Sequence, residues 1–157
     1  KGTIRDNMKW GKADATDQQI DLALSIAQAK DFVDSKLEKL DTMISQGGAN
    51  LSGGQRQRLT IARALVGKPE ILVMDDSASA LDFATDAALR HAIHEQTKGM
   101  TVFIVSQRAT SIKQADKILV LDDGALAGVG THKELMESCQ VYREICLSQL
   151  SEQEVNR

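Results

Sequence analysis

The chain has 157 residues, a length that suits one domain of ordinary size. Its 19 lysines and arginines stand against 22 acidic residues, so no basic field is present and a nucleic-acid partner is not expected. Cys139 and Cys146 lack the C-x-x-C spacing of a metal site, and they are predicted to be free thiols. No run reaches the roughly 18 apolar residues that a membrane span needs.

The first part of the chain is predicted to be helical. Thr16-Asp17-Gln18-Gln19 has the form of a capping box, and apolar residues follow it at helical spacing, which predicts a helix over 17–29. A shorter helix is expected within 31–40. The glycine-containing stretch 45–50 is predicted to be a loop.

The architecture then changes from α to α/β. Ser52 is placed as the N-cap of a helix that Gly67 and Pro69 end. The run Ile71–Met74 is short and uniformly apolar, which predicts a strand buried on both faces, as in a parallel sheet.

Two more strands are expected further along the chain. A helix of about fifteen residues after Asp82 leads to a strand over 101–105, and strand, helix, strand predicts a right-handed parallel crossover. A third strand over 117–121 precedes a turn at 122–124. The capping box Thr131-His132-Lys133-Glu134 predicts the start of the C-terminal helices.

Residues 51–55, Leu-Ser-Gly-Gly-Gln, form the most informative pattern. Two glycines at a helix N-terminus let backbone N–H groups approach an anion, and the positive end of the helix dipole points at the same place. An isolated Ser-Gly-Gly is more often a flexible turn, but here a buried strand ending in Asp75-Asp76 follows. The phosphate loop G-x-x-x-x-G-K-[ST] does not occur in the 157 residues, so the pattern predicts half of a nucleotide site.

Together with their surroundings, these residues resemble the ATP-binding cassette (ABC) family. The resemblance rests on Gln55 to Leu65 with Pro69, on Asp75-Asp76 after the strand, and on Ser79-Ala80-Leu81-Asp82; residues 2–7 also resemble the segment that follows the glutamine loop of exporter cassettes. It implies an α/β fold that is the C-terminal part of a P-loop NTPase cassette. The helical (signature) subdomain would span 1–67, and the later part of the RecA-like core, with parallel strands, crossover helices and C-terminal helices, would span 68–157.

The resemblance also implies ligands and partners. In this family two cassettes sandwich two ATP molecules, and each ATP is held by the P-loop of one cassette and the signature of the other. ATP and Mg²⁺ are therefore the expected cofactors, and a second cassette is the expected partner. Asp75 is expected to hold Mg²⁺ through water. The residues implied to bind ATP are Leu51, Ser52, Gly53, Gly54, Gln55, Ser79 and Asp82.

The two residues in the catalytic positions, Asp76 and Gln107, depart from the family pattern. Asp76 stands where the family has a glutamate base, and its shorter side chain positions the attacking water less well. Gln107 stands where the family has a histidine, and glutamine can bind phosphate but does not titrate. Ser77-Ala78 also replaces the usual Pro-Thr. These changes predict the degenerate site of a heterodimeric multidrug exporter, with neutral drift and retained activity as the alternative.

Three interpretations of function follow from the sequence. The first is part of an exporter at the cytoplasmic face of the plasma (inner) membrane, with segment 42–50 in contact with the coupling helices of the transmembrane domain, or else a plain loop. The second is an ABC ATPase of the DNA-repair or chromosome-organising kind, although no heptad run is present. The third is a module that only lends its signature, and the 157 residues alone are expected to neither bind nor hydrolyse ATP measurably.

The remaining polar and aromatic residues are expected to play ordinary roles. Trp10 is expected to pack against the protein. The histidines are expected to be solvated and three arginines to form a charged helix face. These residues are His91, His94, His132, Arg56, Arg58 and Arg63.

Overall fold

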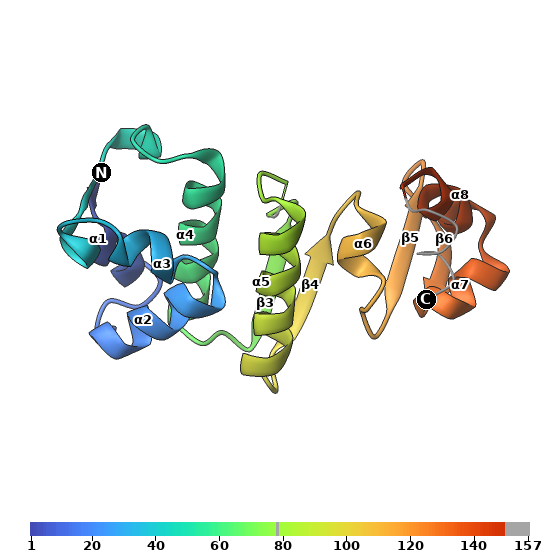
Figure 1. Cartoon of the computed structure of the whole chain (residues 1–157). Coiled ribbons are helices and arrows are strands. Elements are labelled where there is room, and N and C mark those ends of the chain that lie inside the picture. The colour runs from blue at the N-terminus through green and yellow to red at the C-terminus, as the bar shows by residue number, and fades with distance from the viewer. Residues whose placement is uncertain (78, 150–157) are drawn as a thin grey trace. The chain divides into compact units, whose positions relative to one another are not determined.

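The structure is a computed structural model that describes residues 1–77 and 79–149 (Figure 1). The chain separates into two compact units, Lys1–Phe103 and the part from Ile104 onward. Each unit has its own cluster of buried apolar side chains.

The first unit begins with its helical part. Its elements are β1 (Gly2–Thr3), α1 (Ile4–Lys9), α2 (Asp17–Ile26), α3 (Lys30–Asp34), the 3₁₀ helix η1 (Lys39–Asp41), β2 (Met43–Ile44), the 3₁₀ helix η2 (Gln46–Gly48) and α4 (Gly53–Val66). The two short strands pair antiparallel, with Gly2 opposite Ile44. The predicted starts of α2 and α4 are confirmed, and each has the reciprocal hydrogen bonds of a capping box. Helix α1 was not predicted, because its capping box closes with Asp6 in place of the usual Glu or Gln.

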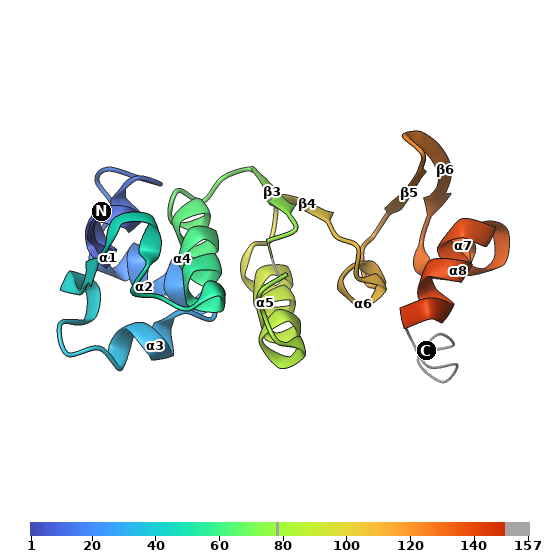
Figure 2. The same cartoon turned by 90° about the horizontal axis from the view of Figure 1, so that it is seen from above.

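The core of the first unit forms where α2 packs against α4 (Figures 1 and 2). Helix α2 buries Ile20, Ala23 and Leu24, residues three and four apart that share one face of the helix. Helix α4 buries Leu59 and Ala62 at the same spacing. The buried side chains of α2 and α4 therefore form one apolar interface between the two helices, the apolar seam of this unit.

A strand, helix, strand segment follows, and the boundary between the two units falls within its last strand. It consists of β3 (Ile71–Asp75), α5 (Phe83–Gln96) and β4 (Thr101–Val105). β3 and β4 are hydrogen-bonded neighbours in a parallel arrangement, and Thr101 N–H donates to the carbonyl of Glu70 at 2.8 Å. The predicted strands and the helix between them are confirmed.

The prediction that β3 is buried on both faces is wrong. Leu72 and Met74 are buried, but Ile71 and Val73 are 60% and 63% exposed. Phe103 on β4 is also exposed. A uniformly apolar strand indicates that both faces suit apolar contact, but within the described part of this unit only one face is covered.

The second unit pairs a hairpin with helices. Its elements are α6 (Ala109–Ile112), β5 (Ile118–Asp122), β6 (Ala125–Gly130), α7 (His132–Ser138) and α8 (Gln140–Gln149). β5 and β6 are antiparallel and joined at Asp123-Gly124, both with positive φ, so the predicted strand and turn are confirmed. The Thr131 capping box is also confirmed. β6 was not predicted, because its small residues carry little strand signal.

Tyr142 lies at the centre of the second unit. Its side chain is buried with Leu135 and Cys146, and its hydroxyl lies 2.9 Å from Nδ1 of His132. Burial raises the pKa of the Tyr142 phenol and of the Cys146 thiol. The prediction of free thiols is confirmed, and both cysteines are buried. The expectation that His132 is solvated is wrong, because its ring is tied to Tyr142.

Two other side chains differ from expectation. Trp10 is 76% exposed, so its predicted packing is wrong. Arg58 was assigned to a charged helix face, but its Nη1 donates to the carbonyl of Gln28 at 2.7 Å and its guanidinium stacks over the ring of Phe32. Neither contact is local in sequence. None of the helices in 1–77 and 79–149 is long and apolar enough to cross a membrane.

Truncating Leu24 should lower the free energy of unfolding by about 2–5 kcal/mol, because Leu24→Ala leaves a cavity in the seam between α2 and α4. Leu24 is 1% exposed and Leu22, on the same helix, is 42% exposed. Leu22→Ala is the matched control and should cost about 1 kcal/mol or less. Denaturant unfolding of the two variants measures both values, and equal losses would contradict the assigned core face.

Candidate functional site

Residues 51–55 form the N-terminus of α4. Ser52 Oγ accepts from Gln55 N–H at 3.2 Å, and Gln55 Oε1 accepts from Ser52 N–H at 3.1 Å. Gly53 and Gly54 are the first two helical residues, and such N–H groups have no acceptor inside their own helix. Ser52 is exposed, and a hydroxyl that accepts one bond still has a hydrogen to donate. This helix terminus therefore has the donors and the dipole of an anion site.

The stretch before residues 51–55, the signature motif, is an ordered turn. Asn50 Oδ1 accepts from the backbone N–H and the hydroxyl of Ser45, each at 3.0 Å, and Asn50 Nδ2 donates to the carbonyl of Met43 at 2.9 Å. Gly47 and Gly48 both have positive φ, which suits glycine. In addition to the short turn of η2, side-chain hydrogen bonds to the backbone therefore hold residues 45–50 in one conformation.

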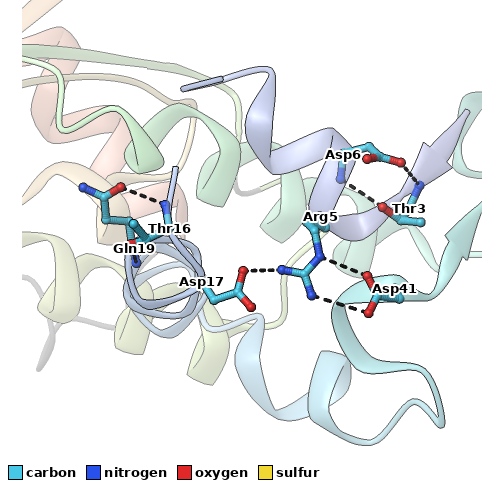
Figure 3. Close-up of polar contacts among 7 residues, drawn as sticks. All are labelled: Thr3, Arg5, Asp6, Thr16, Asp17, Gln19 and Asp41. Atoms are coloured by element: carbon cyan, nitrogen blue, oxygen red, sulfur yellow. Dashed lines mark hydrogen bonds and ion pairs between the residues drawn. The ribbon is translucent and has the colours of Figure 1, made fainter. Parts of the chain in front are cut away.

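Arg5 attaches the start of segment 42–50 to α1 (Figure 3). Its Nε donates to Asp41 Oδ1 at 2.9 Å and its Nη2 lies 3.4 Å from Asp41 Oδ2, while Nη1 pairs with Asp17. The hydrogen bond from Arg5 holds the pKa of Asp41 below its usual value. Ile4 N–H also donates to the carbonyl of Thr42 at 3.0 Å. These hydrogen bonds to α1 therefore hold the start of the segment in place.

A cavity of about 190 Å³ lies beside this segment. Its walls come from α1, from the turn before the signature and from α4. They include Asn7, Met8, Ser45, Gly48, Leu59 and Arg63. The cavity is lined by both apolar and charged side chains.

Asp75 and Asp76 lie at the carboxyl end of β3, and both are exposed. Asp76 has φ of 46°, a left-handed conformation that aspartate adopts more readily than most residues. Its carbonyl accepts from Ser79 N–H at 3.2 Å, so the chain turns sharply after the strand. The strand thus presents two carboxylates in sequence at its end.

Asp75 fits Mg²⁺ that arrives with a nucleotide. Among the described residues there is no group of three or more His, Cys, Asp or Glu side chains arranged to hold a metal. Mg²⁺ is usually bound by one or two carboxylates together with phosphate oxygens and water. One exposed carboxylate at a strand end is compatible with that mode of binding.

Of the other two residues predicted to bind ATP, Asp82 has a clear structural role. It is the N-cap of α5: Thr85 N–H donates to Oδ1 at 2.9 Å and the Thr85 hydroxyl donates to Oδ2 at 2.8 Å. These bonds lower the pKa of Asp82. Ser79 is exposed in the preceding turn. Ala78, part of the departure from Pro-Thr, lies outside the described residues.

Gln57 is a site residue that the sequence analysis missed. From α4, its Nε2 lies 3.3 Å from the carbonyl of Asp76 and 3.2 Å from Ser79 Oγ, and its Oε1 accepts from Ala80 N–H at 3.0 Å. A Cβ on Gly54 would meet the Ala80 carbonyl at 3.1 Å, so glycine permits this close approach. The signature helix and the loop after β3 are thus directly connected. The bonds of Gln57 span 19 to 23 residues, which no local pattern reveals.

Gln107 belongs to the second unit, whereas the other predicted site residues belong to the first. Its side chain is exposed, and its carbonyl accepts from Gln149 Nε2 at 2.8 Å. Gln149 Oε1 accepts in turn from Ala109 N–H at 2.9 Å. Gln149 therefore holds the backbone that carries Gln107, a role that the sequence analysis did not predict.

Comparison with known proteins identifies the family. The sequence profile described as "ABC transporter" matches residues 1–79. The chain belongs to the ABC transporter family. Probable multidrug resistance ABC transporter ATP-binding/permease protein YheI of Bacillus subtilis is 44% identical over 142 residues, 90% of this chain and 24% of YheI. Human ATP-binding cassette sub-family B member 5 is 42% identical over 147 residues, 94% of this chain and 12% of the human protein.

A solved structure agrees with this assignment. The structure of a bacterial Atm1-family ABC exporter with ATP bound is similar to this chain with a TM-score of 0.89 and 34% identity, over 96% of this chain and 26% of the exporter. The predicted α/β cassette fold and the resemblance to exporters are confirmed. The ABC transporter chain described here spans about a quarter or less of the length of these relatives.

The cap at Asp82 should make stability depend on pH. Because its folded pKa is lowered, its contribution is complete above the pKa of the unfolded chain, near 4, and is lost as the pH falls through the lower folded value. We expect wild type to melt above Asp82→Ala at pH 7 and to lose that advantage below about pH 4. Thermal unfolding across pH 2–7 measures this, with neutral Asp82→Asn as the control whose difference from Asp82→Ala should not change with pH. A melting temperature that exceeds that of Asp82→Ala as much at pH 2 as at pH 7 would contradict the assignment of the ionised Asp82 as the N-cap.

Proposed function

We propose that this chain is part of the ATP-binding and ATP-hydrolysing domain of an ABC exporter, and that it supports efflux through ATP-driven dimerisation with a second cassette. The observation that carries the proposal is the N-terminus of α4 within Leu51 to Gln55, where the cap residue Ser52 and the first helical residue Gly53 are exposed. Exporters among the relatives and the ATP-bound exporter of similar structure support it.

In this proposal the signature serves ATP bound by the partner cassette. Ser52 and the N–H groups of Gly53 and Gly54 would bind the γ-phosphate, while Leu51 packs against the core and Gln55 completes the cap. A helix N-terminus supplies about 0.3–1 kcal/mol to a nearby charge, whereas micromolar binding needs about 8 kcal/mol. The signature alone therefore does not hold a nucleotide.

The acids after β3 would serve the chain's own ATP site. Asp75 would hold Mg²⁺ through water, and Mg²⁺ would neutralise charge on the phosphates. Asp76 would polarise the attacking water and Gln107 would bind the γ-phosphate, both less effectively than glutamate and histidine. Ser79 and Asp82 would contact the nucleotide from the loop before α5. This supports a slow, degenerate site in a heterodimer whose other site hydrolyses ATP faster.

Segment 42–50 would contact the coupling helices of a transmembrane domain. The segment is fixed at its start by Arg5 and Asp41, and it borders the cavity of about 190 Å³. A firmly held surface beside a cavity suits the transmission of movement between domains. The chain would then work at the cytoplasmic face of the plasma (inner) membrane.

The exposed faces of the strands support a larger cassette. Ile71, Val73 and Phe103 form an exposed apolar set on β3 and β4, and surfaces of this kind mark contacts with other polypeptide. In the proposal the helical subdomain spans 1–67, and 68–157 is one part of the RecA-like core whose P-loop lies on other residues.

Asp76→Glu should raise ATP turnover at the chain's own site about tenfold, because the longer carboxylate reaches the attacking water. The assay uses the complete transporter, with Ser52→Ala in the same chain to weaken the partner's site so that the remaining phosphate release comes from the site of Asp76. Asp76→Ala is the matched control. No gain with Glu, together with loss of ordinary turnover with Ala, would show that aspartate is already a competent base.

The 157 residues alone should neither bind nor hydrolyse ATP measurably, because they contain no P-loop lysine. Titration calorimetry with Mg²⁺-ATP should show no saturable heat. The complete transporter, in which the P-loop is present, is the positive control. Micromolar affinity of the isolated 157 residues would overturn this expectation.

A further inference from the structure

Gln57, on α4, makes hydrogen bonds with Asp76, Ser79 and Ala80, which follow β3. It uses both ends of its amide: Nε2 faces the Asp76 carbonyl and Ser79 Oγ, and Oε1 accepts from Ala80 N–H. A side-chain amide carries its donor and its acceptor on two separate atoms, so it can bond in two directions at once. Three bonds from one side chain fix the position of the loop in more than one direction.

The bond to Asp76 falls on a strained part of the backbone. Asp76 has φ of 46°, and its carbonyl accepts from Ser79 N–H as well as from Gln57. A left-handed residue other than glycine persists where its surroundings over-determine it. Gln57 supplies part of that constraint, and the orientation of the Asp76 peptide sets where its carboxylate lies.

We propose that Gln57 is a positioning residue that holds Asp76, Ser79 and Ala80 in place against the signature helix α4. The inference rests on the proposed function, in which Asp76 serves one ATP site and Ser52 to Gln55 serve the other. Gln57 then connects the two sites through one side chain.

Gln57 is half-buried on a helix surface and lies outside the apolar seam of the first unit. Its replacement by a side chain of similar length should therefore leave the fold intact. A loss of 1 Å precision at a reacting group costs up to about a hundredfold in rate. The effect of the change should appear in catalysis before it appears in stability.

The decisive variant is Gln57→Met in the complete transporter, since methionine has similar length but cannot make the three bonds. Its kinetics, like those of the control and of Gln57→Glu, are compared in the Ser52→Ala background, so that the remaining turnover comes from the site of Asp76. We expect kcat for ATP to fall about tenfold with KM within about twofold, and the melting temperature to stay within about 2 °C of wild type. Gln18→Met, the same change at an exposed position on α2, is the matched control and should behave as wild type in all three measurements.

Gln57→Glu separates the two ends of the amide. The carboxylate keeps an acceptor for Ala80 N–H and loses the donor to Asp76 and Ser79, so kcat should fall about threefold, between wild type and Gln57→Met. A Gln57→Glu variant as active as wild type would overturn the role given to the donor bonds.

Hydrogen exchange in the complete transporter tests the geometry without reference to activity. The amide of Ala80 should exchange about fivefold faster or more in Gln57→Met, while amides of α2 are unchanged. Unchanged exchange at Ala80, or a kcat equal to wild type, would overturn the inference. A wild-type transporter without ATPase activity would instead contradict the proposed function, and the exchange result would still be informative.

Discussion

The N-cap of α4 at Ser52 is the interaction on which the candidate site depends. It fixes where the helix begins, and so where the N–H groups of Gly53 and Gly54 emerge. The reciprocal bonds between Ser52 and Gln55 use polar groups of the cap and the first helical turn, so this terminus does not rely on distant side chains. The same helix carries Gln57, five residues after the cap, to the loop beyond β3. The start of α4 thus sets the positions of both the N–H groups of Gly53 and Gly54 and the side-chain amide of Gln57.

The remainder of the first unit keeps that helix in place. α2 packs along α4, and Arg58 adds a polar anchor to the end of α2 through the carbonyl of Gln28. On the other side, Arg5 connects α1 to Asp41 and so to the segment before the signature (Figure 3). Apolar packing supplies most of the stability, while the charged contacts set orientation.

Much of the candidate site could be predicted from local patterns. The helix starts at Asp17, Gly53 and His132 follow from capping boxes, whose groups lie within three residues of one another. The signature and the acids after β3 are also contiguous, and they indicated the family before any fold was known. The predictions of burial failed where the presence or absence of a tertiary neighbour decides the outcome. Ile71, Val73 and Trp10 were expected to be packed but are exposed, and His132 was expected to be solvated but lies beside Tyr142. Apolarity records that a side chain suits burial, but it does not say what covers it.

The sequence by itself determined the order of elements, the caps and the family, because these depend on contacts between residues close together along the chain. Only the tertiary structure decided that Gln57 reaches Asp76 and that Gln149 supports the backbone at Gln107. These contacts join residues 19 and 42 positions apart. Such contacts exist only once burial of the apolar seams has brought distant segments together, since their hydrogen bonds are too weak to order the chain alone.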